Sequence, residues 1–368
     1  MYEFIINPIT YNKIPIKSKE GIYIMSHYKR LLKRKGDNVT NKKIKLKVGT
    51  DCSGIEAVLY ALKKLNIDYE HVFSCDNDVS VKKSILTNFK PKMFYDDIFN
   101  RDIQKMEYVD LYVCGFPCQP FSSAGKRLGF EDKIKGTVFF ECYNYIKTKK
   151  PKLFILENVK GLLNHNNGNT IKVILDYLNN LKLYNITMFV LNTKHYGLPQ
   201  NRERVFIIGI LKKYQQKKFI IPKQQPLNMG VIKLIEYIND INLDLKQLRH
   251  LSNFEKKNLK CLRKKYKKKN IDINETPIIA DLGASYKFMS SMIDLSPTLK
   301  ASRSNYYITT LKRKLSPREV LGLQGFPNSF DISVSDNQIY KQAGNSISVN
   351  VLYYILIELF NAIDMDKL

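Results

Sequence analysis

Short apolar runs alternate with amphipathic segments along much of the chain, and the runs have the length of buried strands. The predicted strands are 45–50, 71–75, 92–95, 111–114, 153–156, 186–191 and 204–210, and the predicted helices are 55–65, 80–89, 138–147 and 170–181. Such regular alternation predicts an α/β fold with a doubly wound, mostly parallel sheet between layers of helices.

The alternation breaks after Ile210, which indicates a change of domain. Residues 212–295 are lysine-rich and irregular, and their most basic part is 260–269. The run 260–269 would either bind phosphate groups of a nucleic acid, or form the solvated face of a helix or a flexible loop. The apolar segment 349–356 predicts a helix that packs back on the sheet. We therefore expect a basic extension at 1–44, a main domain at 45–211, a smaller inserted domain at 212–330, and a return to the main domain at 331–368.

The charge balance is strongly basic, with 60 Lys and Arg against 34 Asp and Glu, a formal net charge of +26. This excess attracts polyanions, so nucleic acid is the first partner to consider. Lys, Asn, Ile and Tyr are all abundant, however, as an AT-rich coding sequence would produce, and that bias alone would raise the lysine content. Charge therefore leaves both explanations open.

The six cysteines contain no Cys-x-x-Cys pair and no nearby histidine at zinc spacing, so no metal is expected. Most of them fit small apolar core residues in a reducing compartment. No secretory leader is recognisable, and no apolar run approaches the roughly 20 residues that span a bilayer. These features predict an intracellular protein without membrane contact.

The most informative stretch is Gly115-Phe116-Pro117-Cys118-Gln119-Pro120-Phe121-Ser122, directly after a predicted buried strand. The prolines flanking Cys118 fix φ and remove backbone donors, so this cysteine is expected on a stiff turn at the strand's carboxyl end. Ligands bind at that edge of open parallel sheets. Cys118 is either a structural cysteine in a turn or a thiolate nucleophile.

This stretch resembles the catalytic loop of the cytosine carbon-5 DNA methyltransferases. Further blocks that resemble the family follow in its order, namely Glu157-Asn158-Val159, Gln200-Asn201-Arg202-Glu203-Arg204, 313–327 and Gln342-Ala343-Gly344-Asn345-Ser346. The resemblance runs from about Lys45 to the carboxyl end, apart from the insertion. It implies a Rossmann-like methyltransferase sheet, S-adenosyl-L-methionine as cofactor, and a target-recognition domain in the inserted region.

By this resemblance, Cys118 adds to carbon 6 of a cytosine flipped out of double-stranded DNA, and carbon 5 receives the methyl group. Glu157 would hydrogen-bond ring N3 as negative charge develops on the ring. Arg204 would bind the cytosine O2, with Arg202 close by. Taken singly, Glu157 would fit a surface carboxylate at a strand end, and the arginines would fit an ordinary ion pair with Glu203. The shared order of the blocks favours catalytic roles.

For the cofactor, the resemblance places Asp76 on the ribose hydroxyls and Asp97 on the adenine amino group. The full set of expected cofactor-binding residues is Ser53, Gly54, Ile55, Asp76, Asn77, Asp97, Ile98, Pro117, Asn345 and Ser346. The first block departs from the family's Asp-x-Phe-x-Gly-x-Gly-Gly, because Cys52 replaces the aromatic residue and Glu56 replaces a glycine. Glu56 would either meet the methionine ammonium or begin the helix, where its charge suits the dipole.

The segment after Cys118 is expected to close over the flipped base, with Gln119, Ser122, Lys126 and Arg127 contacting DNA. The variable region 212–311 would then read the flanking sequence in the major groove. We expect a monomer acting on double-stranded DNA. One alternative is a transfer-RNA cytosine-5 methyltransferase, although that branch usually has Pro-Pro-Cys where this chain has Phe116-Pro117-Cys118. The other is a catalytically inactive DNA-binding homologue.

Overall fold

The computed structural model describes residues 4–6, 13–15, 17–18, 21–22, 45–117, 138–241 and 243–364. The predicted nucleophile Cys118 and the predicted DNA-contacting residues Gln119, Ser122, Lys126 and Arg127 lie outside the described residues, so these assignments stay predictions. The described part of the expected N-terminal extension includes an antiparallel pair, β1 (Phe4–Ile6) and β2 (Lys13–Pro15).

Within the described residues, a seven-stranded sheet forms the centre of the protein. Its strands are β3 (Leu46–Asp51), β4 (Tyr69–Cys75), β5 (Met93–Tyr95), β6 (Leu111–Cys114), β7 (Leu153–Val159), β8 (Tyr184–Asn192) and β9 (Glu203–Leu211). They lie in the order β5-β4-β3-β6-β7-β9-β8. All neighbours are parallel except at β9, which is antiparallel to β7 and β8. The prediction of a doubly wound, mostly parallel sheet is confirmed.

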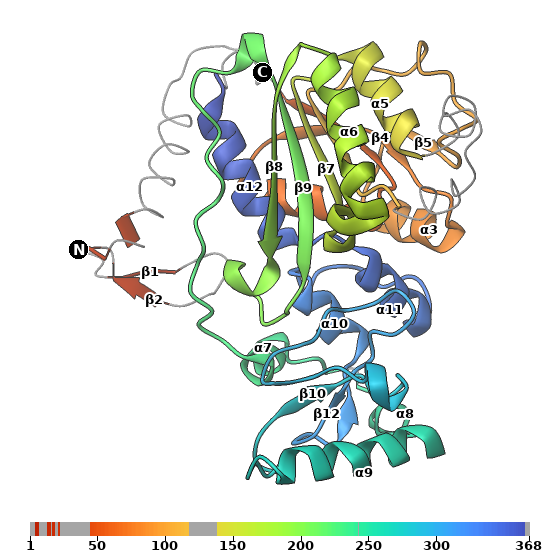
Figure 1. Cartoon of the computed structure of the whole chain (residues 1–368), viewed down its shortest axis with the longest axis vertical. Helices are drawn as coiled ribbons and strands as arrows, with labels where there is room; N and C mark the ends of the chain where they lie inside the picture. The colour runs from red at the N-terminus through yellow and green to blue at the C-terminus, as the bar shows by residue number, and fades with distance from the viewer. Residues whose placement is uncertain are drawn as a thin grey trace.

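Helices cover both faces of this sheet (Figure 1). One face packs against α2 (Ala57–Lys64), α3 (Val79–Asn88) and α12 (Val349–Ala362), and the other against α5 (Val138–Lys149) and α6 (Asn169–Asn180). The predicted helices overlap these ranges, because apolar residues three and four apart mark the side of a helix that is buried.

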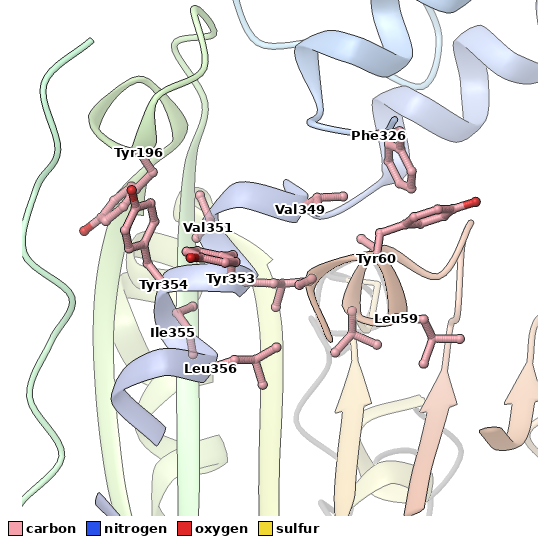
Figure 2. Packing of buried hydrophobic residues seen from close by; sticks show 14 of the residues in the cluster. Leu59, Tyr60, Tyr196, Phe326, Val349, Val351, Tyr353, Tyr354, Ile355 and Leu356 are labelled. Carbon is pink, nitrogen blue, oxygen red and sulfur yellow. The ribbon is translucent and has the colours of Figure 1, made fainter. Parts of the chain in front are cut away.

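Helix α12 contains the apolar segment that was predicted to return to the sheet. Its Tyr353, Ile355 and Leu356 are buried near Leu59 and Tyr60 of α2 (Figure 2). Burying one such side chain contributes about 1.5–3 kcal/mol relative to leaving it exposed. The carboxyl end of the chain therefore helps to hold the first helix of the fold against the sheet.

The stretch from α11 (Asp336–Asn345) through α12 is long and apolar enough to cross a membrane, by length and composition alone. This differs from the expectation that no apolar run would reach that length. The most apolar window of the stretch is 78% buried inside the protein. Its hydrophobicity is therefore that of a core helix.

The region after β9 was expected to be irregular, and this expectation is wrong. It contains α7 (Val231–Ile238), α8 (Leu245–Arg249) and α9 (Asn253–Lys267). Most of the basic run 260–269 belongs to α9, which begins with a capping box between Ser252 and Glu255. Leu262 and Tyr266 of α9 are buried, so its lysines form a solvated helix face. The pattern was hidden because only one side of α9 is buried and lysine fills the rest.

A second, smaller core lies beneath α9. A four-stranded sheet in the order β11-β10-β12-β13 is formed by β10 (Ile278–Ala280), β11 (Ser291–Ile293), β12 (Tyr307–Ile308) and β13 (Arg313–Lys314). Ile278, Tyr307 and Leu262 belong to this core, whereas α7 and α10 (Pro317–Leu323) pack with the main one.

Short 3-10 helices are η2 (Lys160–Gly168), η3 (Thr193–Tyr196), η4 (Lys212–Tyr214) and η5 (Tyr286–Phe288). The domain boundaries at 212 and 330 stay predictions.

Candidate active site

A pocket lies where the strand order reverses. From β3 the chain runs outward through β4 and β5 and then returns to β6 on the other side of β3. Open α/β sheets bind ligands outside the carboxyl ends of the strands at this point. The pocket is lined mainly by residues 50–54 and 56–58, from the end of β3 to the start of α2, by Gly115 after β6, and by Asn345, Ser346 and Ile347. The pocket is partly open to solvent, and its cavity volume is about 40 Å³.

The loop between β3 and α2 has an unusual backbone. Cys52, Gly54 and Glu56 have φ angles of 47°, 54° and 59°, all in the left-handed region. For a non-glycine residue this conformation costs about 1–2 kcal/mol, and such residues concentrate at ligand sites. A Cβ on Gly54 would meet no atom of the described residues within 4 Å, so these residues leave space beside this backbone. A ligand can therefore approach the loop closely at Gly54.

Asp76, at the end of β4, fastens this loop. Its Oδ2 accepts a hydrogen bond from the Gly54 N–H at 3.0 Å, and its Oδ1 accepts one from the Asp78 N–H at 3.1 Å. Burial raises the pKa of the Asp76 carboxyl, although these two backbone donors act in the opposite direction. Each carboxylate oxygen keeps a second lone pair, so Asp76 can still accept hydroxyl groups of a ligand.

The structure brings some of the predicted cofactor residues together and leaves others apart. Ser53, Gly54, Asn345 and Ser346 line the pocket, and Asp76 bonds directly to its wall. The residues outside the lining are Ile55, Asn77, Asp97, Ile98 and Pro117. Asp97 accepts hydrogen bonds from the Phe99 N–H and the Asn100 side chain, which shape its own turn.

Asp51 was not predicted to have a role, and the structure shows that its charge is neutralised. Both of its carboxylate oxygens accept hydrogen bonds from Arg101 at 2.5 Å, and Tyr112 donates to Oδ2. Asp51 and the Arg101 side chain are almost completely buried. The pairing could not be read from the sequence, because Arg101 lies 50 residues away in an irregular segment.

The predicted catalytic pair Glu157 and Arg204 lies on neighbouring strands. Strand β7 continues to Val159, so Glu157 lies within the strand and does not close it at Leu156. Val159 pairs with Arg204 across β7 and β9, which places Glu157 diagonally opposite Arg204. The Glu157 Oε1 lies 3.1 Å from the Arg204 Nε. The register of one antiparallel pair therefore brings the two groups together.

Glu157 is 7% exposed, and burial raises the pKa of its carboxyl group, opposed by the positive charges of Arg204 and Arg202. A buried carboxyl group with a raised pKa keeps its proton at higher pH than a solvated one. A Cβ on Gly115 would lie 3.4 Å from Glu157 Oε2, so the backbone leading toward Cys118 passes close to this carboxyl. Asn158 donates to the Phe116 carbonyl at 2.8 Å and holds the same segment.

Arg202 is buried and makes three hydrogen bonds to backbone carbonyls. Its guanidinium group donates to Leu299 at 2.9 Å, to Gly344 at 3.1 Å and to Ser346 at 2.7 Å. Both terminal nitrogens are therefore occupied. Arg202 lies near Arg204, as predicted, and its bonds tie the backbone of Leu299, Gly344 and Ser346 together. Its assignment to the catalytic residues stays a prediction.

Replacing Arg202 with methionine should lower the free energy of unfolding by about 2–5 kcal/mol, because three buried carbonyls would lose their donor. Urea denaturation followed by circular dichroism measures this change. The exposed Arg263, replaced in the same way, provides a control that should stay near the wild-type midpoint. Equal midpoints for all three proteins would contradict the structural role of Arg202.

Residues 50–361 match the family described as C-5 cytosine-specific DNA methylase. The chain belongs to this family. It is 39% identical over 300 residues to the Type II methyltransferase M.HaeII of Haemophilus aegyptius, covering 80% of this chain and 87% of that protein. It is 34% identical over 252 residues to M.HhaI of Haemophilus parahaemolyticus, covering 67% and 74%. The predicted family and enzyme class, a DNA cytosine-5 methyltransferase, are confirmed.

Solved structures agree on the fold. A DNMT2 variant from Spodoptera frugiperda superposes with a TM-score of 0.61 at 21% identity, covering 86% of this chain and 99% of that one. A methyltransferase named EhMeth from Entamoeba histolytica gives 0.61 at 18% identity, covering 86% and 98%. Among the described residues, no group of three or more His, Cys, Asp or Glu side chains could hold a metal ion.

Proposed function

We propose that this chain transfers a methyl group from S-adenosyl-L-methionine to carbon 5 of cytosine in double-stranded DNA, with Cys118 as the nucleophile. The observation that carries the proposal is the buried pair of Glu157 and Arg204 beside Gly115, three residues before Cys118. The pair lies on β7 and β9. The pocket described above, where the strand order reverses, lies next to the pair at Gly115 and is called the switch-point pocket below. A methyl donor and a pyrimidine can thus meet at the carboxyl edge of the sheet.

In the proposed reaction, the Cys118 thiolate adds to carbon 6 of an extruded cytosine, and negative charge develops on the ring. Glu157, whose carboxyl pKa is raised by burial, donates a proton to N3, while Arg204 donates to O2. Carbon 5 becomes nucleophilic and attacks the methyl group, for which S-adenosyl-L-methionine supplies the electrophilic carbon. A base then removes the carbon-5 proton, the thiolate leaves as the C5–C6 double bond is restored, and N3 returns its proton to Glu157.

The pocket suits such a donor. Gly54 leaves space for close approach, and Asp76 retains acceptor capacity for ribose hydroxyls. Asn345 and Ser346 also line the pocket. We assign Asp97 to the adenine amino group and Ser53, Ile55, Asn77, Ile98 and Pro117 to the surroundings of the nucleoside. Cys52, at the position of the family's aromatic residue, lines the same pocket.

We assign DNA contacts to Gln119, Ser122, Lys126 and Arg127, and target recognition to the inserted region 212–330. The exposed lysines of α9 and the net charge of +26 would attract the phosphate backbone. We further propose that the protein acts as a monomer and works inside the cell, where its DNA substrate is.

Duplex DNA is favoured over transfer RNA because the family that matches residues 50–361 is described as specific for cytosine in DNA. An inactive homologue is disfavoured because Glu157 and Arg204 are both present and lie beside each other with little exposure to solvent. A protein selected only to bind DNA would not need to keep a desolvated carboxyl group at this position.

Methyl transfer can be measured with tritiated S-adenosyl-L-methionine on duplex DNA and on transfer RNA in parallel. We expect incorporation into DNA only, and bisulfite sequencing of DNA from expressing cells should then reveal protected cytosines at one short sequence. Incorporation into transfer RNA alone would contradict the proposed substrate. Incorporation into neither, by a folded protein, would contradict the proposed activity.

A further inference from the structure

Glu56 has a buried carboxylate oxygen that no described residue contacts by a hydrogen bond. The residue is 1% exposed. Its Oε1 accepts hydrogen bonds from the Thr50 and Ser74 hydroxyls, each at 2.6 Å, and lies 3.4 Å from the His71 Nε2. Its Oε2 is buried and has no hydrogen-bond partner in the described structure. Because an unsatisfied buried carboxylate oxygen is costly, a donor is expected there when the protein works.

The helix that follows does not explain this carboxylate. Glu56 occupies the N-cap position of α2, but its side chain makes no capping hydrogen bond. The residue also adopts a left-handed backbone conformation with φ of 59°. The backbone of Glu56 is therefore strained, and Thr50 and Ser74 fix its carboxylate through Oε1 alone. The other oxygen is left for a different partner.

Glu56 also lines the switch-point pocket, where it differs from the neighbouring carboxylates. Asp51 is neutralised by Arg101, and each oxygen of Asp76 accepts a backbone N–H. Among these three groups, only Glu56 has an oxygen without a donor in the described structure. A ligand group that carries both hydrogen-bond donors and a positive charge would satisfy this oxygen best.

We propose that Glu56 binds the α-ammonium group of the methyl donor through Oε2. This inference rests on the proposed function, which makes a sulfonium amino acid the ligand of the pocket. Such a ligand has two cationic groups, but the sulfonium has no N–H and cannot satisfy an orphaned acceptor, whereas the ammonium has three. Glu56 thus recognises the amino-acid end that the donor shares with its demethylated product.

Isothermal titration with S-adenosylhomocysteine, and with its analogue lacking the α-amino group, tests this assignment. The wild-type protein should bind the amino compound about tenfold or more tightly than the deaminated one. Glu56→Gln keeps an acceptor for Thr50 and Ser74 but removes the charge. In this variant the preference for the amino compound should disappear, while affinity for the deaminated analogue stays near the wild-type value.

Glu203→Gln is the matched control, because Glu203 pairs with Lys160 at the surface and does not line the pocket. It should retain the wild-type preference, and thermal melting should show that both variants are folded. An equal loss of affinity for both ligands in Glu56→Gln would overturn the inference and indicate a structural role. An unchanged preference would also overturn it. Failure of the wild-type protein to bind either ligand would count against the proposed function.

Discussion

Replacing Cys118 with alanine should abolish methyl transfer to DNA, lowering kcat by more than about a thousandfold, because no other group in the proposed reaction can add to carbon 6. Tritium incorporation into duplex DNA measures the loss. DNA affinity should change little, because the sulfur becomes bonded to the base only during the reaction. A variant that retained more than a few per cent of the wild-type rate would contradict the nucleophilic role.

A mechanism-based trap tests the nucleophilic role of Cys118 without a measurement of the methyl-transfer rate. Duplex DNA with 5-fluorocytosine in the target should become covalently attached to the wild-type enzyme when S-adenosyl-L-methionine is present, because fluorine cannot leave as a proton does. Cys118→Ala should form no adduct. Cys114→Ala is a suitable control, because this neighbouring thiol is completely buried at the end of β6 and lies 3.2 Å from the Cys142 sulfur.

Replacing Glu157 with glutamine should lower kcat by about 10²–10⁴-fold, the usual contribution of a positioned acid. The glutamine amide can still hydrogen-bond N3, but it cannot transfer a proton. Binding of S-adenosylhomocysteine should be nearly unchanged, since Glu157 does not line the cofactor pocket. The rate of methylation of one duplex in a single turnover, measured with the enzyme in excess, reports the chemical step separately from any change in DNA affinity. A Glu157→Gln enzyme with wild-type turnover would show that N3 needs no acid.

The pH dependence tests the protonation state of Glu157. Burial raises the pKa of this carboxyl group, and activity requires the protonated form, so kcat/KM should fall as pH rises through that raised pKa. Because the charge of Arg204 lowers the same pKa, Arg204→Met should move the falling limb to higher pH while also slowing the reaction. A limb that moves to lower pH, or does not move, would contradict this coupling.

Local sequence patterns were enough to predict most elements of the main sheet. Strand β6, for example, is a continuous apolar run that ends at Cys114, and both the prediction and the structure give 111–114. The same kind of pattern failed in α9, where one buried side is outnumbered by exposed lysines. It also placed the end of β7 too early, because the polar residues Glu157 and Asn158 stay within the strand by pairing with β9.

The blocks that carry chemistry could be located by residue order, whereas their roles within the site depended on distant partners. Arg202 and Arg204 are separated by one residue, yet one bonds to Gly344 and Ser346 and the other lies against Glu157. Nothing in the local sequence distinguishes them. Their partners are set by which strands pair and in which register.

Family, fold class and candidate nucleophile were thus accessible from the sequence, because hydrophobic periodicity and short motifs are properties of neighbouring residues. The tertiary structure alone decided that Asp51 is neutralised by Arg101, that Arg202 bonds to three distant backbone carbonyls, and that one oxygen of Glu56 has no donor among the described residues. Hydrogen bonding and burial depend on residues that folding brings together. In Arg202 and Ser346, those residues are 144 positions apart.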